Sequence, residues 1–217
     1  MDLLINTGSS SVKFSGVRAD GQPIVVGHAD RVVDQVVLTL TEAGESVTIR
    51  TPEEALSPGV LGLLDAVVNW LSARALAPRA VVHRVVHGGA RFVTPVVIDP
   101  TVRAELEALT VLAPLHQPIN LAGIDRFGAA YPEAIAVACF DTAFHAGQSA
   151  FEQHFALPER LFAEGVRRYG FHGLSYAYLT RQLPAQGIDQ AARVVLCHLG
   201  SGASLCAVHQ SVSVAST

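Results

Sequence analysis

The first residues suited to phosphate binding lie in a short turn close to Met1. The turn from Thr7 to Ser11 contains a glycine, which lets backbone N–H groups approach a ligand, and serine hydroxyls, which add hydrogen-bond donors. Lys13, the only lysine in the chain, follows this turn and supplies a positive charge on a flexible side chain. The residue order is not that of a Walker A loop, so the turn predicts either a phosphate contact or an ordinary hairpin.

A second turn, near Thr217, repeats the pattern of the first. It follows an apolar segment that ends at His198, and it reads Leu-Gly-Ser-Gly over residues 199–202 before another apolar segment. An internal repeat of this kind is typical of a duplicated fold, in which the two turns would face one cleft and hold phosphates between them. We therefore expect a first domain over residues 1–190 and the beginning of a second, incomplete domain over residues 191–217.

Arg84 lies in an apolar segment, residues 80–86, that predicts a buried strand. A buried guanidinium must be paired or must face a cleft, and its planar fork suits a carboxylate or a phosphoryl group. The alternative is an ion pair with an aspartate that holds the sheet together. His83 and His87 flank Arg84 at a spacing that does not predict a metal site on a strand. A metal-dependent hydrolase is the weakest interpretation, since the chain has no HExxH motif.

Three further polar residues stand where chemistry is expected. His116 lies between two prolines, which predict a rigid, non-helical corner. Asp141 follows a buried apolar strand, at the carboxyl end where α/β sheets bind ligands, and could orient a metal or a carboxylate. Gly170 and Gly173 flank His172 and leave room for a ligand, so the imidazole could donate to a phosphoryl oxygen. A loop hydrogen bond, a helix cap and structural packing are the respective alternatives.

Strands and helices that alternate along the chain would position these residues. Expected strands cover residues 3–6, 12–17, 23–26, 36–41, 46–50, 80–86, 135–140, 194–199 and 204–208. An expected helix starts at 51–54 and runs to about 71, with Pro58 and Gly59 disturbing its beginning. Further helices are expected from 99 to 109, from 120 to 130, over 158–162 and onward from 173. The first two strands form a hairpin, and the later alternation favours an α/β sheet.

Composition excludes several classes of protein. The net charge of -4 argues against a nucleic-acid partner, and a hydrophobic content of 50% argues against disorder. No apolar segment reaches the roughly 20 residues of a membrane helix, and no signal peptide is recognised. Cys139, Cys197 and Cys206 form no CxxC pair, so free thiols are expected. These features indicate a cytoplasmic protein with no membrane partner.

Six motifs, in the same order and at similar spacing, resemble those of the acetate kinase (acetokinase) family. They are Asn6–Phe14, His83–Gly89, Leu112–Pro118, Phe140–His145, Arg168–Gly173 and His198–Ser204. The resemblance covers essentially the whole chain and corresponds to the N-terminal portion of the family. It implies the acetate and sugar kinase/actin-like fold, an α/β, ribonuclease H-like domain with a mixed sheet flanked by helices, followed by the start of a second, duplicated domain. It also implies ATP as co-substrate and Mg²⁺ as cofactor.

The resemblance also implies roles for individual residues. Catalytic roles fall to Asp141, Arg84, His172 and His116. Contacts with the acyl substrate fall to Arg84, Val86, Leu115 and Phe171. Contacts with phosphate or nucleotide fall to Ser9, Ser11, Lys13, His198, Gly200, Ser201 and Gly202. Asn6 is the residue implied to lie at the metal.

The implied reaction transfers the γ-phosphoryl group of ATP to acetate and gives an acyl phosphate and ADP. Propionate and butyrate are alternative acceptors. Ser201, Gln117 and Tyr176 stand where the family usually has asparagine, asparagine and histidine, so phosphate contacts or substrate preference could differ. The family's adenosine-binding loops, a second arginine and a metal-binding glutamate would lie beyond Thr217. We therefore expect the chain alone to be inactive, and a silent binding or assembly module is the alternative; the family-type homodimer would form through the second domain.

Overall fold

The computed structural model describes residues 1–200 and 202–217. They form two compact units, one of Met1–Val85 with Pro95–Cys139 and one of Val86–Thr94 with Phe140–Thr217. The expected boundary at residue 190 concerns duplicated domains and stays a prediction.

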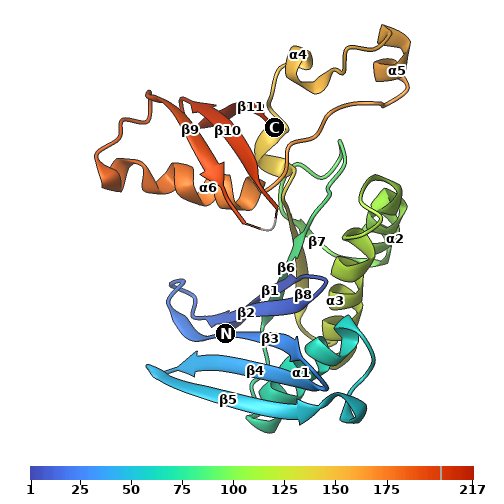
Figure 1. Ribbon diagram of the computed structural model, residues 1–217, viewed down its shortest axis with the longest axis vertical. Helices are drawn as coiled ribbons and strands as arrows, with labels where there is room; N and C mark the ends of the chain where they lie inside the picture. Colours follow the sequence, from blue (N-terminus) through green and yellow to red (C-terminus); the bar gives the residue numbers. More distant parts are fainter. Residues whose placement is uncertain (201) are drawn as a thin grey trace. The chain divides into compact units, whose positions relative to one another are not determined.

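The first unit is built on a mixed, eight-stranded sheet in the order β5-β4-β3-β2-β1-β6-β8-β7 (Figure 1). The strands are β1 (Asp2–Thr7), β2 (Ser11–Val17), β3 (Pro23–Val32), β4 (Gln35–Glu42), β5 (Glu45–Pro52), β6 (Ala80–Val85), β7 (Val96–Val97) and β8 (Ile135–Phe140). Neighbours from β1 to β5 are antiparallel, whereas β1 and β6 are parallel. The predicted α/β class, the mixed sheet and the first hairpin are confirmed.

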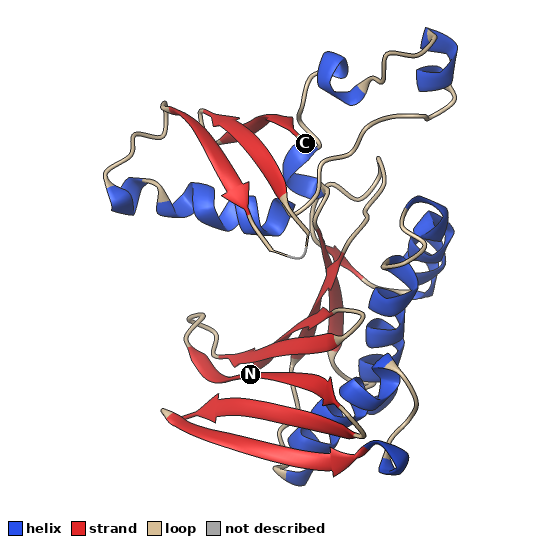
Figure 2. Cartoon of the chain, viewed as in Figure 1, coloured by secondary structure: helices blue, strands red, loops and turns tan. Residues whose placement is uncertain are grey.

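Two helices cover one face of this sheet, as Figure 2 shows. Helix α1 (Val60–Ala73) packs on β2, β3 and β4, and α3 (Gln117–Ala130) packs on β1 and β6. Helix α2 (Pro100–Ala108) lies against α3, and Asp99 caps it by accepting a hydrogen bond from the Val102 N–H at 2.7 Å. Successive strand residues point to opposite faces, so the apolar set on β1 and β2 faces the helices and the polar set faces away. The buried set includes Leu3, Ile5, Val12 and Phe14.

The predicted start of the first long helix is wrong. Pro52 ends β5, Glu53–Ala55 forms only a short 3₁₀ turn (η1), and α1 begins at Val60. Pro58 disfavours a helical conformation at the residue before it, and Gly59 has φ +70°. The cap-like sequence at 51–54 is therefore separated from the helix by a break that these two residues impose.

Helix α3 begins earlier than predicted. His116 occupies the N-cap position and Pro118 lies in the first turn. A proline is tolerated there because its missing N–H would have had no partner within the helix. The corner around His116 therefore ends at the histidine itself, and the predicted non-helical segment is shorter than expected.

The second unit contains a three-stranded sheet in the order β11-β10-β9, with α6 packed on β9. Its elements are η3 (Ala143–His145), α4 (Ala150–Gln153), α5 (Glu159–Ala163), α6 (Gly173–Gln182), η4 (Pro184–Gln186), β9 (Arg193–His198), β10 (Ser204–His209) and β11 (Val212–Ser216). The short 3₁₀ helix η2 (Leu109–Leu112) belongs to the first unit. Tyr176, Leu196, Cys206 and Val208 form the core of the second unit.

The second predicted hairpin is confirmed, because β9 and β10 are antiparallel and pair His198 with Ser204. Strand β11 was not predicted. It is joined to β10 through Gln210 and Ser211, which both have positive φ. In a sequence, a two-residue hairpin turn with two positive φ angles is usually indicated by Asn-Gly or Asp-Gly, and neither dipeptide is present here.

Candidate functional site

A row of polar side chains crosses the sheet face of the first unit that α1 and α3 leave uncovered. Asn6 on β1 lies directly opposite Lys13 on β2. Arg84 on β6 donates a hydrogen bond from Nη1 to Oδ1 of Asn6 at 3.0 Å. Arg84 and Asn6 are partly buried, whereas Lys13 is exposed. One carboxamide thus lies between two cations, an arrangement suited to an anion.

Helix α3 holds the turn that joins β1 to β2. Asn120 donates from Nδ2 to the Thr7 carbonyl at 2.9 Å, and Gly123 passes so close that a Cβ there would lie 2.4 Å from Oγ1 of Thr7. Within the turn, the Gly8 N–H donates to the Ser11 carbonyl at 2.8 Å. The side chain of Ser9 is exposed and that of Ser11 partly buried. Contacts with α3 therefore fix the end of β1 on its buried side, while Ser9 and Ser11 remain near solvent.

The remaining candidates in the first unit lie at the start of α3. His116 is exposed, and Leu115 is 76% exposed. Gln117, the residue that departs from the family's asparagine, is buried and donates from Nε2 to the Leu106 carbonyl at 3.0 Å. This hydrogen bond ties α3 to α2.

Asp141 is buried directly after β8 and opens the segment that leads to η3 in the second unit. The N-cap position of η3 belongs to Thr142. The Thr142 hydroxyl accepts a hydrogen bond from the Gly88 N–H at 3.1 Å. The alternative role of Asp141 as the helix cap is therefore not the one observed.

The glycines that flank His172 make room for protein atoms, so the expectation that they leave space for a ligand is corrected. A Cβ at Gly173 would lie 2.2 Å from the Asp141 carbonyl oxygen, which instead accepts the Gly173 N–H at 2.8 Å. A Cβ at Gly170 would lie 2.5 Å from Cγ of His145. Both glycines thus allow the segment carrying His172 to pack on the segment carrying Asp141.

His172 and His198 form a stacked pair. Their ring centroids lie 4.1 Å apart and their planes differ by 15°. A serine hydroxyl lies at each Nδ1, Ser204 at 2.8 Å from His172 and Ser175 at 3.1 Å from His198. The second turn continues from His198, and a Cβ at Gly202 would be 3.5 Å from Nε2 of His172. The two imidazoles are thus held side by side next to this turn.

The other residues of the second turn are only partly described. Gly200 and Gly202 are exposed. Ser201, the predicted phosphate contact, lies outside the described residues.

Phe171, a predicted acyl-pocket residue, packs against a buried histidine. The ring of His87 meets Phe171 edge-on at a centroid distance of 5.6 Å and Tyr169 at 4.5 Å. Nδ1 of His87 accepts the Gly89 N–H at 2.8 Å, and burial lowers the pKa of this histidine. Val86 is buried next to His87.

Several residues of this region were missed from the sequence. Ser175 and Ser204 orient the stacked imidazoles, and His87 packs on Phe171. His145 closed one of the six motifs, but the sequence offered a role only for Asp141 in that motif. The sequence does not indicate the contacts of these serines with the histidines, since each partner lies on another element.

The described residues contain no group of three or more histidine, cysteine, aspartate or glutamate side chains that could hold a metal ion. The metal assignment of Asn6 therefore stays a prediction, and Oδ1 of that residue already accepts the Arg84 hydrogen bond. Over the same part of the chain, no helix combines the length and the apolar character needed to cross a membrane.

The fold is that of an α/β protein whose first unit carries Arg84 and Lys13 on one sheet face and whose second unit carries a stacked pair of imidazoles. The sequence profile of the acetokinase family matches residues 1–217, and the chain belongs to this family. The resemblance inferred from the six motifs is thereby confirmed.

Individual relatives agree with this assignment. The chain is 43% identical to an acetate kinase of Nitrobacter hamburgensis, over 99% of this chain and 55% of that protein. It is 40% identical to an acetate kinase of Methylocella silvestris, over 99% of this chain and 57% of that protein. A propionate kinase structure from Francisella tularensis matches with a TM-score of 0.86 at 30% identity, covering 100% of this chain and 56% of that one. The chain thus spans about half the length of the relatives that it matches.

Proposed function

We propose that this chain carries the acyl-side and phosphoryl-side residues of a kinase that moves the γ-phosphoryl group of ATP to acetate or another short carboxylate. The observation that carries the proposal is the contact of Arg84 with Asn6, with Lys13 on the neighbouring strand. Two cations beside one carboxamide suit a carboxylate and a phosphoryl group better than a neutral ligand. Family membership supports the reaction class.

The proposed chemistry needs little from the protein beyond charge and position. A carboxylate oxygen of the substrate forms a bond to the γ-phosphorus while the bond to the β–γ bridging oxygen breaks, giving acyl phosphate and ADP. The carboxylate is already a nucleophile, so no strong base is required. The obstacle is repulsion between two anions, which Arg84 and Lys13 would offset. Mg²⁺ bound with ATP would supply further positive charge.

The stacked histidines are proposed to contact the phosphoryl group as it is transferred. The Ser204 hydroxyl at Nδ1 orients the His172 ring, and this imidazole is proposed to donate a hydrogen bond to a phosphoryl oxygen. Asp141 is proposed as the essential acid near the metal and the substrate. His116 is proposed as a second imidazole donor. Phe171 and Val86, which are held by the surrounding protein of the second unit, are proposed to contact the acyl group. Leu115 of the first unit is proposed as a further acyl contact.

The test of the proposal uses a fusion protein. This chain is joined to the part of the Nitrobacter hamburgensis relative that follows the region it matches. The fusion protein is incubated with ATP, Mg²⁺ and acetate, and acyl phosphate is trapped as its hydroxamate. We expect hydroxamate from the fusion protein and none from the 217-residue chain alone. Parallel reactions with propionate and butyrate measure the acyl preference, since one methylene changes discrimination by only about 1–3 kcal/mol.

A silent binding or assembly module is the second candidate function. In this candidate, Arg84 and Lys13 would bind an anionic ligand without phosphoryl transfer. A folded fusion protein that binds ATP·Mg²⁺ but forms no hydroxamate would favour this alternative. Turnover that disappears in the Arg84→Ala fusion would exclude it.

A further inference from the structure

The conformation of His172 requires an explanation beyond its own side chain. This residue has φ +57°, in the left-handed region that residues with a Cβ disfavour. It occupies the N-cap position of α6, and its carbonyl accepts the Tyr176 N–H at 3.1 Å. The Gly173 N–H donates to the Asp141 carbonyl on the far side. Such a backbone persists only where its surroundings hold it on both sides.

On the N-terminal side of His172, the backbone is held by His145. Its Nε2 lies 2.9 Å from the carbonyl oxygen of Phe171, the residue directly before His172. A carbonyl oxygen only accepts hydrogen bonds, so Nε2 of His145 must carry the proton. Gly170 allows this contact, because any larger residue there would collide with the His145 ring.

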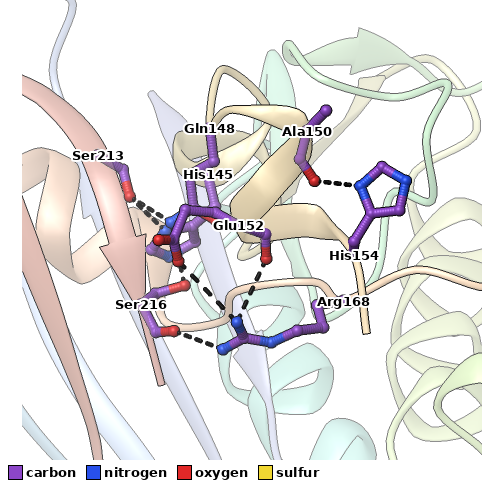
Figure 3. A network of polar contacts seen from close by, with 8 residues as sticks. All are labelled: His145, Gln148, Ala150, Glu152, His154, Arg168, Ser213 and Ser216. Atoms are coloured by element: carbon purple, nitrogen blue, oxygen red, sulfur yellow. Dashed lines mark hydrogen bonds and ion pairs between the residues drawn. The ribbon is translucent and has the colours of Figure 1, made fainter. Parts of the chain in front are cut away.

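The other nitrogen of His145 fixes the same tautomer. Nδ1 lies 2.9 Å from the hydroxyl of Ser213, and Gln148 donates from Nε2 to that same oxygen at 2.9 Å (Figure 3). With Nε2 protonated, a neutral His145 accepts at Nδ1, so Ser213 donates its proton there. The hydrogen bonds then run in one direction, from Gln148 through Ser213 and His145 to Phe171.

Burial keeps this network intact. His145 and Ser213 are each 4% exposed. Burial lowers the pKa of His145, although the Phe171 carbonyl and the charge of Asp141 oppose the effect. Burial therefore favours the neutral ring, which the direction of the network requires. Gln148 also reaches the hydroxyl of Ser216 at 3.1 Å, so its amide is held as well.

We propose that His145 is a positioning residue, which holds the Phe171 carbonyl and thereby sets the left-handed backbone of His172. Both of its ring nitrogens have protein partners, the Ser213 hydroxyl and the Phe171 carbonyl. By holding the Phe171 carbonyl, it positions both Phe171, the proposed acyl contact, and His172, the proposed phosphoryl donor. The effect on catalysis therefore rests on the proposed function. Ser213 lies on β11, so this strand also helps to hold His145 in place.

The first test reads the tautomer of His145 directly. The 217-residue chain is labelled with ¹⁵N-histidine, and long-range ¹H–¹⁵N spectra are recorded at neutral pH. We expect a neutral ring with its proton on Nε2. Ser213→Ala removes the donor at Nδ1 but leaves the Phe171 carbonyl at Nε2, so the proton should stay on Nε2 while the Nδ1 chemical shift changes. Ser216→Ala, the matched control in the same network, should leave the signal unchanged. A ring protonated on Nδ1 in the wild type would overturn the proposal.

The second test reads the backbone around His172. Hydrogen exchange of the Gly173 amide is measured relative to the amides of β9 and β10, so that global destabilisation cancels. His145→Leu, which lacks the donor, should accelerate the relative exchange by about tenfold, whereas His145→Gln, whose amide can replace Nε2–H, should stay within about twofold of the wild type. If His145→Leu does not fold, Ser213→Ala supplies the comparison, with an expected acceleration of about threefold against none for Ser216→Ala.

The outcomes separate the two proposals. Equal exchange in the leucine and glutamine variants, or no acceleration in either His145→Leu or Ser213→Ala, would overturn the positioning role. Neither measurement uses ATP or a carboxylate. A fusion protein that forms no hydroxamate while the tautomer and exchange results hold would refute the proposed function alone.

Discussion

Arg84 donates a hydrogen bond of 3.0 Å to Asn6 across the parallel pair of β6 and β1. This contact fixes the planar guanidinium on the sheet face that no helix of the first unit covers. Lys13, opposite Asn6 on β2, places a second positive charge on the same face. The proposed binding of a carboxylate and a phosphoryl group depends on these two charges.

Replacing Arg84 should therefore impair the reaction more than replacing its neighbour. In the fusion protein, Arg84→Ala should lower kcat/KM for acetate by roughly 100-fold, since a hydrogen bond to a charged group contributes about 1.5–3 kcal/mol. Asn6→Ala should lower it by about tenfold, because the guanidinium loses one neutral partner. Arg50→Ala, which removes an exposed arginine of β5, is the control and should have no effect. Equal activity of Arg84→Ala and Arg50→Ala would contradict the assignment.

Lys13 offers a chemical test, because it is the only lysine of this chain. An amine-acylating reagent can modify its ε-amino group and the α-amino group of Met1, and peptide mass spectrometry separates the two products. ATP·Mg²⁺ should slow acylation of Lys13 by about tenfold at saturation, because bound phosphate covers the ammonium. The α-amino group of Met1 is the internal control and should react at an unchanged rate. Unprotected Lys13 in a fusion protein that binds ATP would show that this residue does not contact phosphate.

Two glycines of α3 should respond in opposite directions to the same substitution. Gly123→Ala places a methyl group 2.4 Å from Oγ1 of Thr7 and should destabilise the chain by about 1–3 kcal/mol. Gly128→Ala meets no atom within 4 Å and should stabilise it by about 0.5–1 kcal/mol, because alanine favours a helix. Urea unfolding of both variants measures the difference. Similar changes in both would mean that α3 does not press on the end of β1.

His83 should make the stability of the chain fall in mild acid. Nε2 of this residue is buried with no hydrogen-bond partner among the described residues, and burial lowers its pKa to about 4 from 6.5, although the charge of Asp125 opposes this. The unfolded chain therefore binds the proton more readily. Stability is complete above about pH 6.5 and is lost as the pH falls toward the folded pKa, by about 2 kcal/mol between about pH 8 and about pH 5.

The control for this pH dependence is His83→Leu, which removes the titrating group. Urea unfolding at both pH values should show a loss of stability smaller by about 2 kcal/mol in this variant than in the wild type. An unchanged pH dependence in His83→Leu would assign the effect to other groups, such as His87 and His145, whose pKa values burial also lowers.

The elements that depend on local pattern were predictable from the sequence. The β1–β2 hairpin followed from apolar residues around a glycine-containing turn, and α2 followed from Asp99 before Pro100. The start of α1 was misplaced because a favourable cap sequence was outweighed by Pro58 and Gly59 a few residues later. Local signals compete, and the sequence alone does not rank them.

The relationships that build the candidate site depend on packing between distant segments. The stacked rings of His172 and His198 are oriented by Ser204 on β10 and Ser175 on α6. The sequence around these serines does not indicate which histidine each one contacts. Gly170 and Gly173 illustrate the same limit, since the space beside a glycine can be filled by a ligand or by the protein itself. Here His145 and the Asp141 carbonyl fill it.

The central claim is that residues of this chain bind the acyl and phosphoryl groups together. Calorimetric titration of the 217-residue chain with acetyl phosphate tests it most directly, alongside Arg84→Ala and Arg50→Ala. We predict saturable binding at one site that weakens by at least about tenfold in Arg84→Ala and is unchanged in Arg50→Ala. Absence of saturable binding to the folded wild-type chain, or equal affinity of Arg84→Ala and the wild type, would contradict the claim.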